Sequence, residues 1–166
     1  MNESIIIKPP YLCSNEMVSD FAELTNQIET LNRDRTIDKV KSCILLGFLY
    51  TINNQLASIG AVKNNGYGYR DDIFDKAGLK NESIRYHIEI GYLYTVPLYR
   101  GLGFSHKLLK YLITECSHKN IFATIANDNV VSVNMFMRNG FEKLGFEFNS
   151  NLSSEYKIQL FGKKNV

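Results

Sequence analysis

The chain has 166 residues, of which 45% are hydrophobic and 22% are charged, and its formal net charge at pH 7 is +2. This length is enough for one domain that buries its own core. The small net charge argues against a nucleic-acid binder that works by bulk positive charge. No apolar run approaches the roughly 20 residues of a membrane-spanning helix. We therefore expect a single domain over residues 1–166, with no nucleic-acid partner and no membrane partner.

The cysteines indicate a reducing compartment. Cys13, Cys43 and Cys116 lie far apart in the chain, and their odd number and spacing fit neither a disulfide framework nor a zinc site. The first residues lack the basic and apolar segments of a secretory signal. We expect a cytoplasmic protein with reduced cysteines and no metal.

The first part of the chain alternates between strand and helix patterns. The expected elements, in chain order, are a strand over 5–8, a helix over 15–31, a short helix near 37–41, and two strands over 43–52 and 55–62. Ser14 or Asn15 is a suitable N-cap for the first helix. Asn53 and Asn54 suit a tight hairpin turn, because asparagine tolerates a positive φ.

A polar stretch over residues 63–83 interrupts this pattern. We expect mainly an excursion with one helical turn near 71–77, and long excursions in compact domains are often functional. Its aromatic and acidic side chains either line a site for a cationic amine or form a solvated loop. These side chains are Tyr67, Tyr69, Asp71, Asp72 and Asp75.

The second half predicts further strands and helices. The expected elements are a strand over 84–96 ended by Pro97, a helix over 104–118, a strand over 121–126, a helix over 129–139 closed by Gly140, and two strands over 141–148 and 156–160. Hairpin-paired strands followed by alternating strands and helices predict an α/β (α+β) chain with a mixed sheet.

Residues 96–105, which read VPLYRGLGFS, predict an anion site where a strand passes into a helix. Gly101 and Gly103 leave the backbone accessible. The helix N-terminus contributes N–H groups and a partial positive charge. Arg100 adds a guanidinium whose donors suit phosphate oxygens. A dinucleotide fingerprint needs a glycine where His106 stands, and a P-loop needs Gly-Lys-Ser/Thr, so neither of these motifs is present.

This segment resembles the cofactor motif of the GNAT superfamily of acetyl-CoA-dependent acyltransferases, Arg/Gln-x-x-Gly-x-Gly/Ala. Arg100 and Gly103 match, and Ser105 occupies the last small-residue position. A second family block, Asn-x-x-Ala/Ser-x-x-hydrophobic-Tyr-x-x-x-Gly-Phe, resembles residues 129–141, which read NVVSVNMFMRNGF. Together the two blocks and their spacing cover about 50 residues.

The resemblance implies a GNAT fold, a splayed mixed sheet of six to seven strands with helices on both faces. It implies that acetyl-CoA is the acyl donor and lies between the fourth and fifth strands. It also implies that the pantetheine arm pairs with the strand that precedes the loop. The implied cofactor contacts are Leu93, Tyr94, Thr95, Val96, Arg100, Gly101, Leu102, Gly103, Phe104, Ser105, Asn129, Ser132 and Phe136.

An amine acceptor must lose a proton before it attacks the thioester, and Glu89 is the candidate base. It shares a face with Gly91, Leu93 and Thr95 if the strand is regular. A solvated or ion-paired glutamate is the alternative role for Glu89. His87, on the same face, is the alternative base.

The family's general acid, a tyrosine, is replaced by Phe136, which cannot donate a proton. Tyr94 and Tyr92 are candidates for that role, with packing on the strand as the alternative. Because a thiol with a pKa of about 8.5 leaves readily as a thiolate, we expect activity to survive the substitution.

The leading hypothesis is an N-acetyltransferase that acts on a small-molecule amine or a protein amino group. A catalytically weak coenzyme A-binding sensor is the second hypothesis, and a nucleotide-binding protein that uses the same loop is the third. Members of this family often form homodimers, so the resemblance makes a homodimer one possible oligomeric state of this chain.

Overall fold

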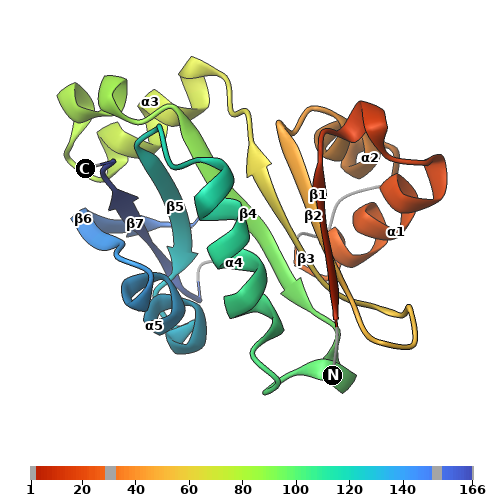
Figure 1. Ribbon diagram of the computed structural model, residues 1–166. Helices are drawn as coiled ribbons and strands as arrows, with labels where there is room; N and C mark the ends of the chain where they lie inside the picture. The colour runs from red at the N-terminus through yellow and green to blue at the C-terminus, as the bar shows by residue number, and fades with distance from the viewer. Residues whose placement is uncertain (1–2, 29–32, 151–154, 166) are drawn as a thin grey trace. The chain divides into compact units, whose positions relative to one another are not determined.

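The computed structural model describes residues 3–28, 33–150 and 155–165 (Figure 1). Its strands form a seven-stranded sheet in the order β1-β2-β3-β4-β5-β7-β6. The chain divides into two compact units, Met1–Asn64 with Ile90–Glu115, and Asn65–Glu89 with Cys116–Val166. Strand β4 begins in the second unit and ends in the first. The α/β chain with a mixed sheet that the sequence predicted is confirmed, whereas the single domain over 1–166 stays a prediction.

The first unit contains the first strands and three longer helices. Its elements are β1 (Ser4–Lys8), η1 (Pro10–Leu12), α1 (Asn15–Thr25), α2 (Arg33–Lys41), β2 (Leu45–Tyr50), β3 (Leu56–Lys63), most of β4 (Ile88–Thr95), η3 (Pro97–Tyr99) and α4 (Phe104–Glu115). Strands β1 and β2 pair antiparallel, as do β2 and β3, and β4 follows β3 in the sheet.

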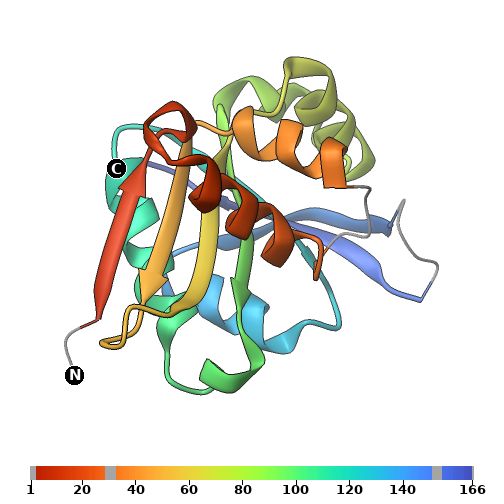
Figure 2. The same ribbon diagram turned by 90° about the vertical axis from the view of Figure 1, so that its right-hand side faces the viewer.

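Helices α1 and α2 cover one face of these strands. Phe21 of α1 is fully buried against Phe48 of β2, with ring centroids 5.5 Å apart in an edge-to-face arrangement. Val40 of α2 and Ile59 of β3 complete the same apolar cluster. Figure 2 shows α1 in front of β1–β3 and α4 behind them.

Two glycines on the opposite face let α4 lie close to the sheet. Gly47 and Gly60 are directly paired across β2 and β3. A Cβ on Gly47 would lie 3.1 Å from Leu108 Cδ1, and one on Gly60 would lie 2.9 Å from Leu112 Cδ1. Any side chain there would push these leucines out of a packed core.

The second unit contains the remaining strands. Its elements are α3 (Tyr67–Lys76), η2 (Lys80–Arg85), the start of β4, β5 (Ile121–Ala126), α5 (Val130–Arg138), β6 (Glu142–Asn149) and β7 (Lys157–Lys163). Strand β4 pairs in parallel with β5 at Ile88–Ile121 and Glu89–Phe122. Strand β7 pairs antiparallel with both β5 and β6.

Residues 63–83 are more helical than the sequence predicted. Helix α3 has ten residues, and the expected strand from 84 begins only at Ile88 because Lys80–Arg85 forms a 3₁₀ helix. Aromatic contacts explain the longer helix. The centroid of the Phe74 ring lies 5.2 Å from that of Tyr86 and 5.5 Å from that of Phe122. These contacts, together with buried Ile73, stabilise a helix whose other residues are mostly polar.

Several local predictions are confirmed. Ser14 caps α1 by accepting a hydrogen bond from the Met17 N–H at 3.2 Å. Asn54 has a φ of 58° in the β2–β3 turn, and Gly140 has a φ of 81° after α5. Helix α1 ends at Thr25, earlier than predicted, and the expected end near Leu31 lies outside the described residues.

No helix within residues 3–28, 33–150 and 155–165 has the length and apolar character needed to cross a bilayer.

Gly145 offers a test of the β6 backbone. It has a φ of 59°, β6 changes register between Leu144 and Phe148, and an added Cβ would overlap the Ala77 carbonyl oxygen. We expect Gly145→Ala to lower the free energy of unfolding by about 2–4 kcal/mol, measured by urea denaturation. The control Gly68→Ala, in α3 with open space around its Cβ, should be neutral or stabilising. Equal stability of the two variants would contradict this packing.

Candidate functional site

The loop between β4 and α4 has the backbone geometry of an anion site. Gly101 has a φ of 81° and Gly103 a φ of 78°, values that glycine adopts without strain. A Cβ built on either glycine would have no atom within 4 Å. The space in front of both glycines is therefore open, and any side chain added there would fill it.

The first turn of α4 directs its N–H groups toward this loop. The Lys107 N–H makes the first bond of the helix, to the Gly103 carbonyl oxygen at 3.0 Å. The amides of Phe104, Ser105 and His106 precede this bond and have no helical acceptor. Together with the helix dipole, they provide donors and a partial positive charge for an anion.

Arg100 supplies a full positive charge beside the loop. Its Nε donates to the Thr95 carbonyl oxygen at 3.2 Å, and its guanidinium lies 5.6 Å from the centre of the Tyr94 ring. Lys107 is paired with Glu3 at 2.6 Å, and this hydrogen bond lowers the pKa of the Glu3 carboxyl group. Arg100 is exposed, so its remaining N–H groups are accessible to a ligand.

Three hydroxyl groups join the end of β4 to the start of α4. The Ser58 hydroxyl of β3 donates to the Tyr94 carbonyl oxygen at 2.9 Å and lies 3.0 Å from Thr95 Oγ1. Thr95 Oγ1 in turn contacts Ser105 Oγ. The sequence reasoning named Thr95 and Ser105 but missed Ser58. A lone serine in the otherwise apolar stretch of β3 was the available signal.

The other predicted contacts of this loop divide into buried and exposed positions. Phe104 is 8% exposed and packs with Leu49 and Ala57, whereas Leu102 is 62% exposed. The Val96 N–H donates to the Ala57 carbonyl oxygen at 2.9 Å, which fixes β4 to β3. The Val96 carbonyl oxygen accepts from the Tyr99 N–H at 2.9 Å, so both backbone groups of Val96 already have partners within the protein.

Strand β4 is irregular at Tyr92, which has a φ of 53°. The shared face predicted for Glu89 and Leu93 assumed a regular strand, so that argument does not hold. Tyr92 is buried in the α1/α2 core with Lys63 Nζ 4.7 Å from its ring centre, and Tyr94 packs against the same core. These contacts favour packing as the role of both tyrosine rings.

Glu89, in the second unit, has a buried and hydrogen-bonded carboxylate. Only 2% of the surface of Glu89 is exposed. One oxygen accepts from Thr124 Oγ1 of β5 at 2.8 Å, and the other accepts from Asn65 Nδ2. The solvated-glutamate alternative is therefore wrong. His87 lies before the start of β4 and is exposed.

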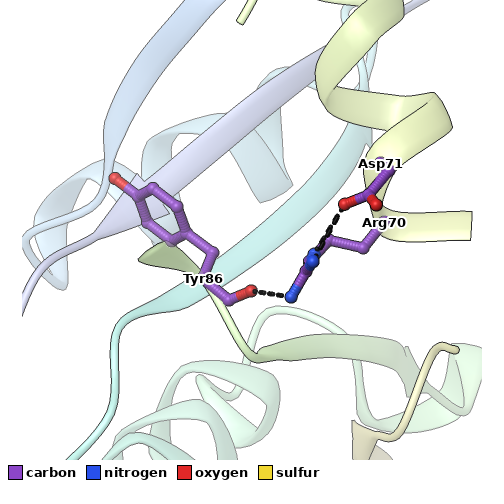
Figure 3. Close-up of polar contacts among 3 residues, drawn as sticks. All are labelled: Arg70, Asp71 and Tyr86. Atoms are coloured by element: carbon purple, nitrogen blue, oxygen red, sulfur yellow. Dashed lines mark hydrogen bonds and ion pairs between the residues drawn. The ribbon is translucent and has the colours of Figure 1, made fainter. Parts of the chain in front are cut away.

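The aspartates of α3 each have a basic neighbour. Figure 3 shows buried Arg70, which donates to Asp71 Oδ1 at 2.9 Å and to the Tyr86 carbonyl oxygen at 3.3 Å. Hydrogen bonds from Ser83 and from Arg70 lower the pKa of Asp71.

Asp72 lies 2.7 Å from Lys76, and Asp75 lies 3.9 Å from Lys80. Much of the acidic charge expected to attract a cationic amine is thus compensated locally. Tyr67 and Tyr69 of the same helix are exposed.

The second block of predicted contacts lies on α5. Asn129 Oδ1 accepts from the Ser132 N–H at 3.1 Å and so caps the helix, which leaves its Nδ2 as the accessible donor. Phe136 is 3% exposed, and its ring lies 4.9 Å from that of Phe141 in an edge-to-face arrangement. Phe136 therefore serves the core of this unit.

Comparison with known proteins agrees with this geometry. Residues 77–141 match the model of the Acetyltransferase (GNAT) family. A solved structure proposed to be a phosphinothricin N-acetyltransferase aligns with a TM-score of 0.73 at 15% identity, covering 98% of this chain and 99% of that chain. The chain has the GNAT fold.

Two further GNAT-like structures are similar. An acyl-CoA N-acyltransferase from Pseudomonas aeruginosa aligns with a TM-score of 0.69 at 9% identity, covering 98% of this chain and 100% of that chain. An acetyltransferase of the GNAT family from Streptococcus pneumoniae aligns with a TM-score of 0.65 at 12% identity, covering 96% and 98%. No match was found among curated protein sequences.

The segment that matches the GNAT model contains Glu89, the β4–α4 loop and the α5 block. The predicted catalytic and cofactor-binding residues all lie inside it, whereas the candidate acceptor-site residues at positions 67–75 precede it. Ser58 lies outside it, on β3, which explains why motif reasoning did not reach this residue.

The cap of α5 can be tested apart from any ligand. We expect Asn129→Ala to lower the free energy of unfolding by about 1 kcal/mol, because the Ser132 N–H loses its acceptor. Asn129→Asp keeps an acceptor oxygen and should unfold like the wild type. Thermal denaturation of the three proteins measures the difference. Similar stability of the Ala and Asp variants would contradict the role of Asn129 as the cap of α5.

Proposed function

We propose that the protein is an acetyl-CoA-dependent N-acetyltransferase that acts on a primary amine of a small molecule or a protein. The observation that carries this proposal is the β4–α4 loop, where open space in front of Gly101 and Gly103 adjoins the amides of the α4 N-terminus. A diphosphate is the part of coenzyme A that such a loop suits. The GNAT fold supports the assignment.

The residues present fit this ligand. Bare glycine backbone lets phosphate oxygens approach the amides of Gly103, Phe104 and Ser105, and Arg100 adds a cation on the same loop. The peptide groups of Leu93 to Thr95 are the proposed partners of the pantetheine amides. Asn129 Nδ2 and Ser132 of the second unit are proposed as further contacts.

When bound, acetyl-CoA supplies an acetyl group as a thioester. The amine attacks the carbonyl carbon, a C–N bond forms, and the C–S bond breaks to release the thiolate. Glu89 takes the proton that the attacking nitrogen loses, directly or through a water molecule. The hydrogen bonds from Thr124 and Asn65 orient its carboxylate.

No protein acid is required for the thiolate to leave. Phe136 occupies the position of the family's tyrosine and is packed against Phe141. Because a thiol pKa of about 8.5 makes the thiolate a fair leaving group, its protonation by solvent suffices. Tyr94, which is only partly buried, is proposed as the second source of this proton.

The same buried Phe136 favours one alternative, a coenzyme A-binding sensor with little activity. Incubation with acetyl-CoA and a panel of amines separates the two functions. Release of free thiol that depends on an amine supports the enzyme. Binding of acetyl-CoA without thiol release supports the sensor.

Substitution of Gly103 tests the diphosphate loop. We expect Gly103→Val to weaken acetyl-CoA binding at least about tenfold by calorimetry, because a side chain would fill the phosphate position. Gly103→Asn serves as the matched variant, since asparagine tolerates a left-handed backbone better than valine. It should retain stability while losing affinity. Unchanged affinity in both variants would place the diphosphate elsewhere.

Substitution of Glu89 tests the base. We expect Glu89→Gln to lower kcat about 10²-fold at pH 7 and progressively less toward pH 10, where an amine with a pKa of about 10.4 is partly neutral. The control Glu82→Gln changes an η2 carboxylate that is ion-paired with Arg85 and should leave the rate unchanged. A pH-independent loss in Glu89→Gln would remove Glu89 from this role.

A further inference from the structure

Ser58 is a fully buried serine whose position in β3 suggests a role beyond packing. Its neighbours Ala57 and Ile59 are apolar and equally buried. A buried hydroxyl group is tolerated only where it is hydrogen-bonded. Ser58 meets this requirement at the end of β4, next to the proposed diphosphate loop.

The number of protons fixes the direction of the hydroxyl chain. A carbonyl oxygen can only accept, so the single Ser58 proton goes to the Tyr94 carbonyl oxygen at 2.9 Å. The contact of 3.0 Å between Ser58 Oγ and Thr95 Oγ1 must then be donated by Thr95. With its proton used, Thr95 accepts from Ser105.

The opposite assignment leaves an unfavourable contact. If Thr95 donated to Ser105, two oxygen atoms without a proton between them would face each other at the 3.0 Å contact of Ser58 and Thr95. Ser105 Oγ also lies 3.5 Å from Ser58 Oγ, which is longer than the 3.0 Å contact of Ser58 with Thr95. The chain of shortest satisfied contacts therefore runs from Ser105 through Thr95 and Ser58 to the Tyr94 carbonyl group. It links the first turn of α4, the end of β4 and β3.

We propose that Ser58 is a positioning residue for the diphosphate loop. It holds the end of β4 through the Tyr94 carbonyl group and holds the start of α4 through Thr95 and Ser105. This inference rests on the proposed function, because it concerns the same loop. It also narrows the predicted role of Ser105 as a cofactor contact. The Ser105 hydroxyl group donates to Thr95, so its N–H is the group proposed to contact the ligand.

The physical effect is preorganisation. Amides bind an anion strongly only when they already point at it, because ordering a loop on binding costs affinity. Ser58 touches no ligand in this scheme. Its loss should therefore weaken the binding of acetyl-CoA while leaving the chemical step at saturation nearly unchanged.

Two substitutions of nearly equal shape isolate the hydroxyl group. Ser58→Thr keeps the donor, whereas Ser58→Val replaces it with a methyl group of similar volume. We expect the KM for acetyl-CoA of the Val variant to exceed that of the Thr variant about tenfold, with kcat within about twofold. Calorimetric Kd values for coenzyme A should differ by the same factor.

Thr95→Val provides a second test should Ser58→Val fail to fold. It removes the middle hydroxyl of the chain at constant shape and should raise the KM for acetyl-CoA in the same way. Equal KM values for the Thr and Val variants of Ser58, or a loss confined to kcat, would overturn the positioning role. A wild-type protein that binds no coenzyme A would instead overturn the proposed function itself.

Discussion

The accessible amides at the start of α4 are the feature on which the proposed chemistry depends. A chain can point several N–H groups at one anion only where its backbone turns and no side chain intervenes. Gly101 and Gly103 meet both conditions through their left-handed φ values and the open space around them. The rest of the first unit holds the N-terminus of α4 in place. The paired glycines of β2 and β3 let α4 pack on these strands, and Ser58 connects β3 to the end of β4.

Much of the fold and of the loop was predictable because local sequence determines local geometry there. Hydrophobic periodicity predicted β5 and α4, and capping chemistry predicted Ser14 and Gly140. The glycine loop was recognisable because its residue types follow directly from the backbone it must adopt. Such signals come from residues close together in the chain.

Other features were not predictable because they depend on contacts between distant residues. Helix α3 exists because Phe74 meets Tyr86 and Phe122, which its own polar sequence does not indicate. The irregular φ of Tyr92 and the burial of Glu89 between Asn65 and Thr124 likewise arise from tertiary packing. Ser58 lies about 40 residues before the loop it is proposed to position. The family motif therefore identifies the atoms that would bind but not those that hold them in place.

The most direct measurement of the central claim is the amide ¹H–¹⁵N spectrum of the protein during titration with coenzyme A. The account predicts that the largest shifts fall on the N–H groups of Gly103, Phe104 and Ser105. It also predicts that pantetheine, which lacks the diphosphate, leaves these signals nearly unmoved. Shifts that avoid these three amides, or a spectrum unchanged at millimolar coenzyme A, would contradict it.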